Sequence, residues 1–304
     1  NPLHRPAQRW KRNRQCYWKR SIPRSCTGRT GKRFLKTPVP SAQNWLLLLT
    51  YEGTCYHGWQ VQPNSPTIEE TLEQAVRSLT GETVKVHGAG RTDSGVHALN
   101  FTANFTAIAE NFKTAEKWRV ALNAVLPPDI VVKYAQTVAA DFHARHSAVG
   151  KRYRYLISNL PYKPPFSLNQ SWWVSQDLDI DLMREAADLL VGKHDFSAFR
   201  AASCSSPSSV KDLRVIEIFE VRSRHSTLQI EMEANSFLQH MVRIIAGTLV
   251  EVGRGYKNVE DVAQALESGQ RKQAGKTAPG HGLYSLSVIY PEGMIEWPLE
   301  MLDN

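Results

Sequence analysis

The sequence predicts an α+β protein in which one order of elements, β-α-β-β-α-β, occurs twice in succession. Segments with strand-like alternation of apolar and polar residues interleave with segments of helical spacing, in the same order in both parts of the chain. The 304 residues, 42% of them hydrophobic, suffice for two domains of ordinary size. Because this order is that of the ferredoxin-like unit, we expect two tandem ferredoxin-like domains, at 44–148 and 149–304. The cleft between them is the natural place for a site.

The first predicted domain begins with a leucine-rich strand at 45–51. Residues 67–70 read TIEE, a capping box with Thr67 as N-cap, and helical spacing follows until Gly81. The other elements predicted for this domain are strands at 83–87 and 100–106, a helix at 115–126 and a strand at 130–134.

The second predicted domain repeats the order with longer connections. The second of its two main helices is almost entirely apolar, and glycines end both of them. The predicted elements are strands at 152–157, 215–221, 227–234 and 283–290, helices at 181–191 and 237–252, and a short extra helix at 259–266.

Charge is distributed very unevenly along the chain. Of the 37 Lys and Arg residues, 12 lie before Glu52, which is the first acidic residue, so the rest of the chain has 25 basic and 29 acidic residues. Residues 1–43 form a basic arm without periodicity, which we expect to be disordered. Three interpretations remain open: an RNA-binding arm, an organelle transit peptide, or an over-extended gene model, since the chain begins with Asn1. Any nucleic-acid surface on the folded body must be a local patch.

Several classes of protein are disfavoured by composition. The chain contains no apolar run near the length of a membrane span. The four cysteines, Cys16, Cys26, Cys55 and Cys204, are scattered and form no C-x-x-C pair, which argues against a disulfide framework and a zinc site. A reducing compartment follows, and we expect a cytoplasmic protein, or an organellar one if the arm is a transit peptide.

A glycine-rich loop at 88–99 is the stretch around which the chain is organised. It carries three glycines between two predicted strands, with Arg91 two residues before Asp93. Such loops often hold catalytic groups. The alternative is an Asx-type turn, in which Asp93 bonds its own backbone and Arg91 is solvated.

The loop resembles a known signature. Residues 90–98 read GRTDSGVHA, similar to the GRTDAGVHA signature of the TruA family of tRNA pseudouridine synthases, with Ser94 as the one departure. The resemblance implies that Asp93 is the catalytic carboxylate and that Arg91 helps to hold the RNA in its flipped state.

Two further segments resemble motifs of the same family. Residues 151–155 read KRYRY, similar to the family's R-x-Y-x-Y, which implies that Tyr153 stacks on the target base; the alternative is an edge strand with one aromatic and one basic face. Residues 237–253 resemble an apolar family helix with one charge, Arg243. A buried arginine needs a carboxylate partner, and the resemblance assigns that role to Asp93.

Weaker resemblances cover four more segments. Residues 52–62 depart from the family pattern at Glu52 and Tyr56, and residues 277–283 place Leu283 in a segment that lines the pocket of the family. In 193–199 we prefer a capping role for His194 and Asp195 to a proton relay. In 141–146 the two histidines, His143 and His146, lack a third ligand, so we reject a metal site. We expect His240 to be structural or to contact phosphate.

The resemblance covers residues 45 to about 290 and implies a function. It implies isomerisation of uridine to pseudouridine in the tRNA anticodon arm, near positions 38 to 40, without metal or cofactor, by a homodimer that binds no membrane. It also implies two ferredoxin-like domains whose sheets join into one antiparallel sheet, with RNA in a central groove. Asp93 could attack C1′ or C6 of the nucleotide or act as a base.

Two rival functions make different demands on the chain. An inactive ferredoxin-like RNA-binding protein would be damaged at Asp93, Tyr153 or Arg243, and all three are intact. A metal-dependent hydrolase would need a second carboxylate near the loop, whereas the nearest acidic residues are Glu82 and Glu110.

Overall fold

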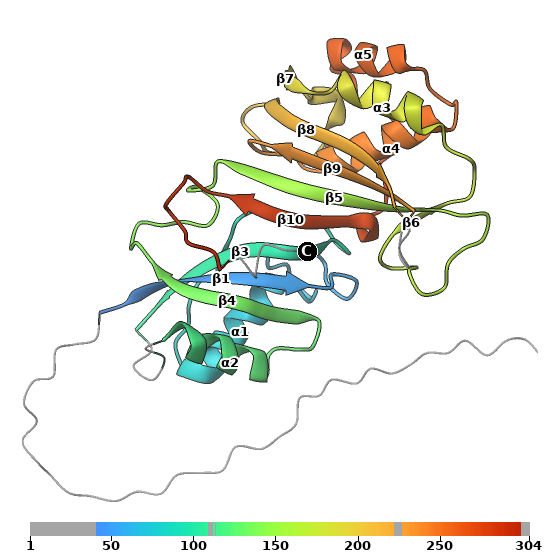
Figure 1. The fold of residues 1–304 in the computed structure, drawn as a ribbon. Helices are drawn as coiled ribbons and strands as arrows, with labels where there is room; N and C mark the ends of the chain where they lie inside the picture. Colours follow the sequence, from blue (N-terminus) through green and yellow to red (C-terminus); the bar gives the residue numbers. More distant parts are fainter. Residues whose placement is uncertain (1–40, 109–111, 113, 222–226, 299–304) are drawn as a thin grey trace, which may run out of the picture. The chain divides into compact units, whose positions relative to one another are not determined.

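The strands of the described chain form one mixed sheet. The computed structural model describes residues 41–108, 112, 114–221 and 227–298, so most of the arm predicted at 1–43 lies outside the described residues. The strand order is β4-β1-β3-β10-β5-β9-β8-β7, with β2 paired to β3 and β6 paired to β5 (Figure 1). The strands are β1 (Gln43–Tyr51), β2 (His87–Gly88), β3 (His97–Ala107), β4 (Ile130–Val138), β5 (Gly150–Asn159), β6 (Trp172–Val174), β7 (Gly192–Asp195), β8 (Val210–Glu220), β9 (Leu228–Ala234) and β10 (Leu283–Ile289).

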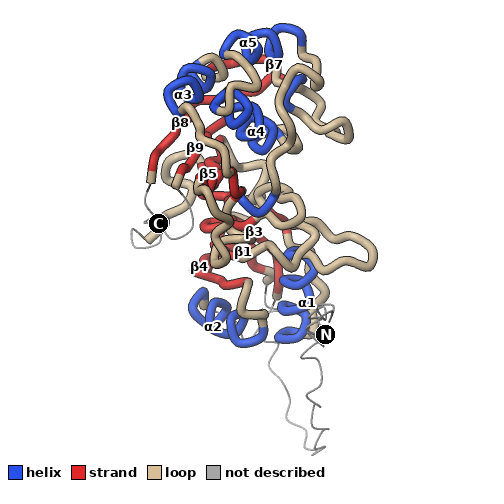
Figure 2. Tube along the Cα trace, turned by 90° about the vertical axis from the view of Figure 1, so that its right-hand side faces the viewer, coloured by secondary structure: helices blue, strands red, loops and turns tan. Residues whose placement is uncertain are grey.

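The helices gather in two groups beside this sheet. Helices α1 and α2 lie beside β1 and β4, and α3, α4 and α5 lie near β7, β8 and β9 (Figure 2). The bounds are α1 (Ile68–Thr80), α2 (Ala115–Val125), α3 (Ile180–Asp188), α4 (Met241–Gly253) and α5 (Val259–Ser268), with short 3₁₀ turns η1 (Ser197–Phe199) and η2 (Gly280–Gly282).

The leucine run of β1 is buried on both faces of the sheet. Leu47 and Leu49 pack in the main core of this part of the sheet, whereas Leu46 packs on the other face with Phe142 and Val288. A strand covered on both faces carries a continuous apolar run instead of an alternating one. The predicted strand is therefore confirmed. Its continuous apolar run fits the position of β1 inside the sheet, where it pairs with β3 and β4.

Two local predictions around α1 are wrong. Thr67 is the N-cap residue, but its side chain makes no capping bond, and its hydroxyl is buried without a partner among the described residues. The strand predicted at 83–87 shrinks to His87–Gly88. The reason is that α1 binds this segment through side chains: the backbone N–H of Val86 donates to Glu73 Oε1 at 3.1 Å, a donor that a strand ladder would otherwise use. The predicted end of α1 is confirmed, since Gly81 is left-handed with φ 77°.

Helix boundaries in the second part differ from the predictions. The apolar helix begins at Met241 and not at 237, because His240 adopts a left-handed conformation with φ 65° immediately before it. Helix α3 ends at Asp188, and Gly192 opens the unpredicted strand β7 instead of capping the helix. The extra helix predicted at 259–266 is confirmed as α5.

The junction between the first four strands and the rest is parallel. Strand β10 pairs with β3 in parallel through two residue pairs, Tyr284 with His97 and Ser285 with Ala98, while β10 pairs with β5 antiparallel. The expected fully antiparallel sheet is therefore wrong at this joint. Strand β2 occupies only the far end of β3, opposite Ala103 and Asn104, which leaves the start of β3 open to β10.

Candidate functional site

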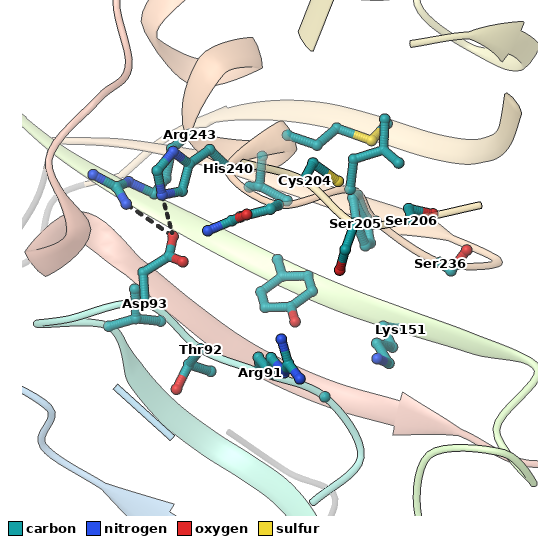
Figure 3. Close-up of a pocket in the computed structure, with 18 of the residues that line it drawn as sticks. Arg91, Thr92, Asp93, Lys151, Cys204, Ser205, Ser206, Ser236, His240 and Arg243 are labelled. Atoms are coloured by element: carbon teal, nitrogen blue, oxygen red, sulfur yellow. Dashed lines mark hydrogen bonds and ion pairs between the residues drawn. The ribbon is translucent and has the colours of Figure 1, made fainter. Parts of the chain in front are cut away.

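A cavity of about 940 Å³ lies beside the parallel junction. Its wall is formed by the loop before β3, the start of β5, the segment 203–208, and the beginning of α4 with the residues just before it (Figure 3). All five residues predicted for the site line this cavity: Arg91, Asp93, Tyr153, Arg243 and Leu283.

The loop that carries Asp93 is clamped by the segment after β1. The N–H of Trp59 donates to the carbonyl of Thr92 at 3.1 Å, and Gly58, at φ 88°, lies so close that a Cβ would come within 2.2 Å of that oxygen. The loop closes with a bond from Val96 N to the Asp93 carbonyl at 3.2 Å. The two segments thus fix the backbone of Asp93 while its side chain projects into the cavity.

The carboxylate of Asp93 turns to the second part of the chain. Arg243 Nη1 donates to Asp93 Oδ2 at 2.8 Å, so the predicted contact is present. Arg243 Nε donates to the carbonyl of Ala278 at 2.8 Å, which fixes the plane of the guanidinium. This arrangement differs from the Asx turn considered above, because Figure 3 shows the carboxylate aimed at Arg243 and His240. The ion pair neutralises the carboxylate and orients it.

His240 lies against the same oxygen. Its Nε2 is 3.5 Å from Asp93 Oδ2. Burial lowers the pKa of His240 more strongly than the Asp93 charge raises it, so the imidazole is neutral at neutral pH. His240 is therefore a neighbour of the Asp93–Arg243 pair and not a second cation.

Tyr153 is buried beside Asp93, with 8% of its surface exposed. Its ring meets Phe237 edge to face, with centroids 5.1 Å apart. Burial, and then the charge of Asp93, raises the pKa of the phenol, which stays protonated. The alternative of an edge strand is wrong, because β5 pairs with β10 on one side and with β9 on the other.

Alternation along β5 separates its aromatic and basic residues. Arg152 and Arg154 point away from the tyrosines and both pair with Glu231 at 2.8 Å. Tyr155 follows Tyr153 on the buried face and donates to the carbonyl of Pro279 at 2.7 Å.

The charged residues of the cavity wall are mostly basic. Lys151, Arg145 and Lys211 line it together with Arg91 and Arg243, and Asp93 is the one acidic residue among the lining residues. This agrees with the expected local basic patch on an otherwise mildly acidic body. The first three were missed from the sequence. For Lys151 a signal existed, since it lies two residues before Tyr153 on one strand and therefore shares its face.

The ionisation of Lys151 is shifted by its surroundings. Burial, assisted by the charge of Arg145, lowers the pKa of Lys151 to about 8. Its ammonium lies against the backbone of Gly90, where a Cβ would come within 2.7 Å of Nζ. Figure 3 places Lys151 beyond Arg91 as seen from Asp93. Its ammonium and the carboxylate of Asp93 are therefore separated along the cavity wall (Figure 3).

The remaining histidine motifs lie outside the cavity lining. His194 bonds the carbonyl of Val191 at 2.9 Å, and Asp195 accepts from the N–H of Ser197 at 2.9 Å, as expected for capping. The ring of His143 packs at a tilt against the rings of His146 and, unexpectedly, of His87, with centroids 4.3 and 4.8 Å away. Among the described residues no group of three or more His, Cys, Asp or Glu side chains is arranged to hold a metal ion.

Two further findings concern the expectations from composition. Cys55 and Cys204, the cysteines within the described part of the chain, are free thiols. None of the helices in that part is both long and apolar enough to cross a membrane.

Comparison with known proteins identifies the family. The sequence profile described as tRNA pseudouridine synthase matches residues 48–147 and 186–291. A tRNA pseudouridine synthase A of Acetivibrio thermocellus is 45% identical over 248 residues, covering 82% of this chain and all of that protein. Proteins of the same name from Thermoanaerobacter sp. strain X514 and Myxococcus xanthus are 46% and 44% identical, over 82% and 81% of this chain and 100% and 92% of their own lengths. The chain belongs to the TruA family of tRNA pseudouridine synthases.

Proposed function

We propose that this protein converts uridine to pseudouridine in the anticodon stem-loop of tRNA, around positions 38 to 40, with Asp93 as the catalytic carboxylate. The family membership makes it a tRNA pseudouridine synthase, an isomerase. The observation that carries the proposal is the Asp93 carboxylate, bound through one oxygen to Arg243 at the edge of a cavity lined by cations. Its other oxygen, Oδ1, has no hydrogen-bond partner among the described residues and is available to the substrate.

The groups that this reaction needs are a carboxylate and an aromatic face, which Asp93 and Tyr153 would supply. The C1′–N1 bond of uridine breaks, the base rotates and a C1′–C5 bond forms. C5 then loses its proton to solvent and N1 gains one, so the product is an isomer of the substrate. Asp93 would stabilise or bond to C1′ of the sugar as the base departs, or would add to C6 of the base. Tyr153 would offer an aromatic face on which the loosened base can turn, since stacking does not fix a hydrogen-bonding edge. Leu283, at the start of β10 and 6% exposed, would close the apolar side.

Binding of RNA would rest on the other cations. A nucleotide must leave its stack to reach the half-buried carboxylate of Asp93, and Arg91 beside it would stabilise the flipped state. Arg145, Lys151 and Lys211 would meet phosphates, which supply most of the affinity for nucleic acids. The enzyme would work as a homodimer, without a small-molecule cofactor and in the cytoplasm.

We also propose that the fold consists of two tandem ferredoxin-like domains, at 44–148 and 149–304. The strand orders β4-β1-β3-β2 and β10-β5-β9-β8 support this, because each is the 4-1-3-2 order of one such unit. Strands β6 and β7 and helix α5 are additions to the second unit.

Replacing Asp93 tests the function. Asp93→Asn keeps the size of the side chain and removes its charge, so turnover should vanish while tRNA binding survives. Tritium release from tRNA carrying 5-³H-uridine and filter binding, at one salt concentration, measure the two quantities. Asp188→Asn, at an exposed position of α3 outside the cavity lining, is the matched control and should change neither. Turnover within about tenfold of wild type, roughly 1.4 kcal/mol of barrier, would remove Asp93 from the mechanism.

The inactive RNA-binding protein is the rival that this experiment addresses directly. It predicts tRNA binding with no tritium release from the wild-type protein. Mapping the product by carbodiimide-dependent primer-extension stops then locates the modified positions, and stops outside the anticodon arm would contradict the proposed target.

A further inference from the structure

His97 is a buried titratable residue for which the mechanism above has no use. It is the first residue of β3, four positions after Asp93, and only 2% of it is exposed. Both ring nitrogens are engaged. The backbone N–H of Gly53 donates to Nδ1 at 3.0 Å, and Nε2 lies 2.8 Å from the carbonyl of Asn169 and 3.1 Å from that of His281.

These partners determine the protonation state of the ring. A backbone N–H can only donate, so Nδ1 must carry a lone pair; a carbonyl can only accept, so Nε2 must carry the hydrogen. These three hydrogen bonds together require the neutral Nε2–H imidazole. Protonation of Nδ1 would leave the N–H of Gly53 buried without its acceptor.

The same contacts cross the junction of the sheet. Gly53 follows β1 and belongs to the segment that clamps the Asp93 loop, whereas Asn169 and His281 belong to the second part of the chain. The imidazole also stacks on Tyr284 of β10, with centroids 4.7 Å apart. His97 and Tyr284 form one of the only two residue pairs of the parallel joint.

The joint in turn determines the distance between the catalytic residues. The Asp93 loop meets the segment before β10 at Gly280, where a Cβ would come within 2.4 Å of the Ser94 carbonyl. Two residues earlier, Ala278 exchanges two hydrogen bonds with Arg243, one through its N–H and one through its carbonyl. A shift at the joint would therefore move Asp93 relative to Arg243.

We propose that His97 is a positioning residue, which, as the neutral imidazole, fastens the two parts of the sheet so that Asp93 and Arg243 meet. The proposal deepens, and rests on, the proposed function of the same site. Its consequence is that protonation of His97 disassembles the pair and lowers catalysis at acid pH, without any change in the catalytic groups themselves.

The charged groups around the ring determine the direction of this effect. Burial lowers the pKa of His97 from its ordinary 6.5, and the carboxylate of Glu52, 3.4 Å from Nδ1, partly opposes this. Tyr284 and His281, the titratable groups on the other side, stay neutral, since burial raises the pKa of the first and lowers that of the second. Lys163 acts on His281 from further out. The contacts of the neutral His97 ring across the joint are therefore intact at neutral pH. They are lost as the pH falls through the lowered pKa of His97.

Glu52 offers the ring a second partner. A proton on Nδ1 could be donated to Glu52 Oε1 in place of the bond from Gly53. Replacing Glu52 by Gln removes the charge that favours the protonated ring, so the acid loss of activity should move to lower pH. This variant tests the proposal even if variants at position 97 fail to fold.

The experiment compares pH profiles of kcat/KM between about pH 5 and pH 8 for wild type and three variants. In wild type we expect a fall of about tenfold per pH unit below the pKa of His97. His97→Asn keeps an acceptor for Gly53 but cannot titrate or reach Asn169, so its plateau should drop and its acid fall should disappear. Glu52→Gln should shift the fall to lower pH, and His240→Gln should keep it, because His240 is the other histidine beside Asp93.

An acid fall that persists in His97→Asn, or one that disappears in His240→Gln, would overturn the proposal. The His97 imidazole resonances of the whole protein, followed by NMR and assigned by their loss in His97→Asn, report its titration without any activity. If wild type converts no uridine at any pH, the proposed function fails. An unshifted His97 titration in Glu52→Gln would instead contradict the proposed role of His97 and leave the function standing.

Discussion

Arg243 and Asp93 are 150 residues apart in the chain, and their side chains meet across the junction of the sheet with Nη1 and Oδ2 2.8 Å apart. The aspartate comes from a loop that glycines and backbone bonds fix in place, and the arginine comes from an apolar helix. Arg243 can find no other partner of opposite charge among the described residues of the cavity wall, where Asp93 is the single carboxylate.

Replacing Arg243 should therefore affect catalysis and stability together. Arg243→Lys keeps the charge but cannot bond Asp93 and the Ala278 carbonyl at once, so kcat/KM should fall about 10²-fold. Arg243→Ala should also lower the free energy of unfolding by about 2 kcal/mol, measured by urea denaturation, because a half-buried carboxylate loses its partner. Arg119→Ala, which breaks a solvent-exposed pair with Glu116 on α2, should change the free energy of unfolding far less than Arg243→Ala does. A fully active Arg243→Ala enzyme would contradict the proposed role of the pair.

Tyr153 should matter through its ring and not through its hydroxyl. Tyr153→Phe keeps the stacking face and should bind tRNA like wild type. Tyr153→Ala should lose turnover, together with about 1–3 kcal/mol of stacking energy. Tyr256→Ala, which removes an exposed ring outside the cavity lining, is the control for aromatic loss. Single-turnover assays with equilibrium filter binding separate the two effects, and equal activity of the Ala and Phe variants would exclude a stacking role.

Lys151 should make tRNA binding sensitive to alkaline pH. Its pKa of about 8 means that it loses its proton as the pH rises through that value, and a neutral amine does not attract phosphate. The affinity of wild type should decline from about pH 7.5 to about pH 9, whereas Lys151→Arg should bind evenly over this range, because arginine stays charged. Filter binding at constant ionic strength measures the change. Lys117→Arg, at an exposed position of α2, should leave the decline in place, and an undiminished decline in Lys151→Arg would assign it to another group.

Deleting residues 1–40 tests the basic arm. The described strands begin at Gln43, so we expect the fold and the tritium-release activity to be retained. If the arm binds RNA, the slope of log affinity against log salt concentration should become shallower by about 0.9 for each phosphate that the shortened protein no longer neutralises. An unchanged slope would exclude an RNA-binding arm, and a truncated protein that fails to fold would contradict the expected disorder.

The local chemistry of the chain was sufficient to predict most elements and the central loop. Alternation at Phe101, Ala103 and Phe105, the helical spacing after Thr67 and the left-handed Gly81 are encoded by neighbours within a few residues. The motif around Asp93 is likewise contiguous, so its resemblance to the family was visible without coordinates. The expected partnership with Arg243 came from that resemblance, supported by the rule that an arginine in an apolar helix needs a carboxylate.

Tertiary contacts decided the features that depend on distant segments. The buried N–H of Val86 donates to Glu73 instead of to a neighbouring strand, so most of the strand predicted at 83–87 is absent. The left-handed backbone of His240 makes the apolar helix begin at Met241, later than predicted. The parallel joint of β3 with β10 follows from how far β2 extends along β3, and period-two patterns carry no information about which edge is left open. The cations of the cavity and the engagement of His97 at both nitrogens have the same origin. The sequence shows the same residue whether its charge or imidazole meets water or a distant carbonyl, and the carbonyl partners of His97 lie 72 and 184 residues away. Only the packing of the two parts brings such partners within hydrogen-bonding distance.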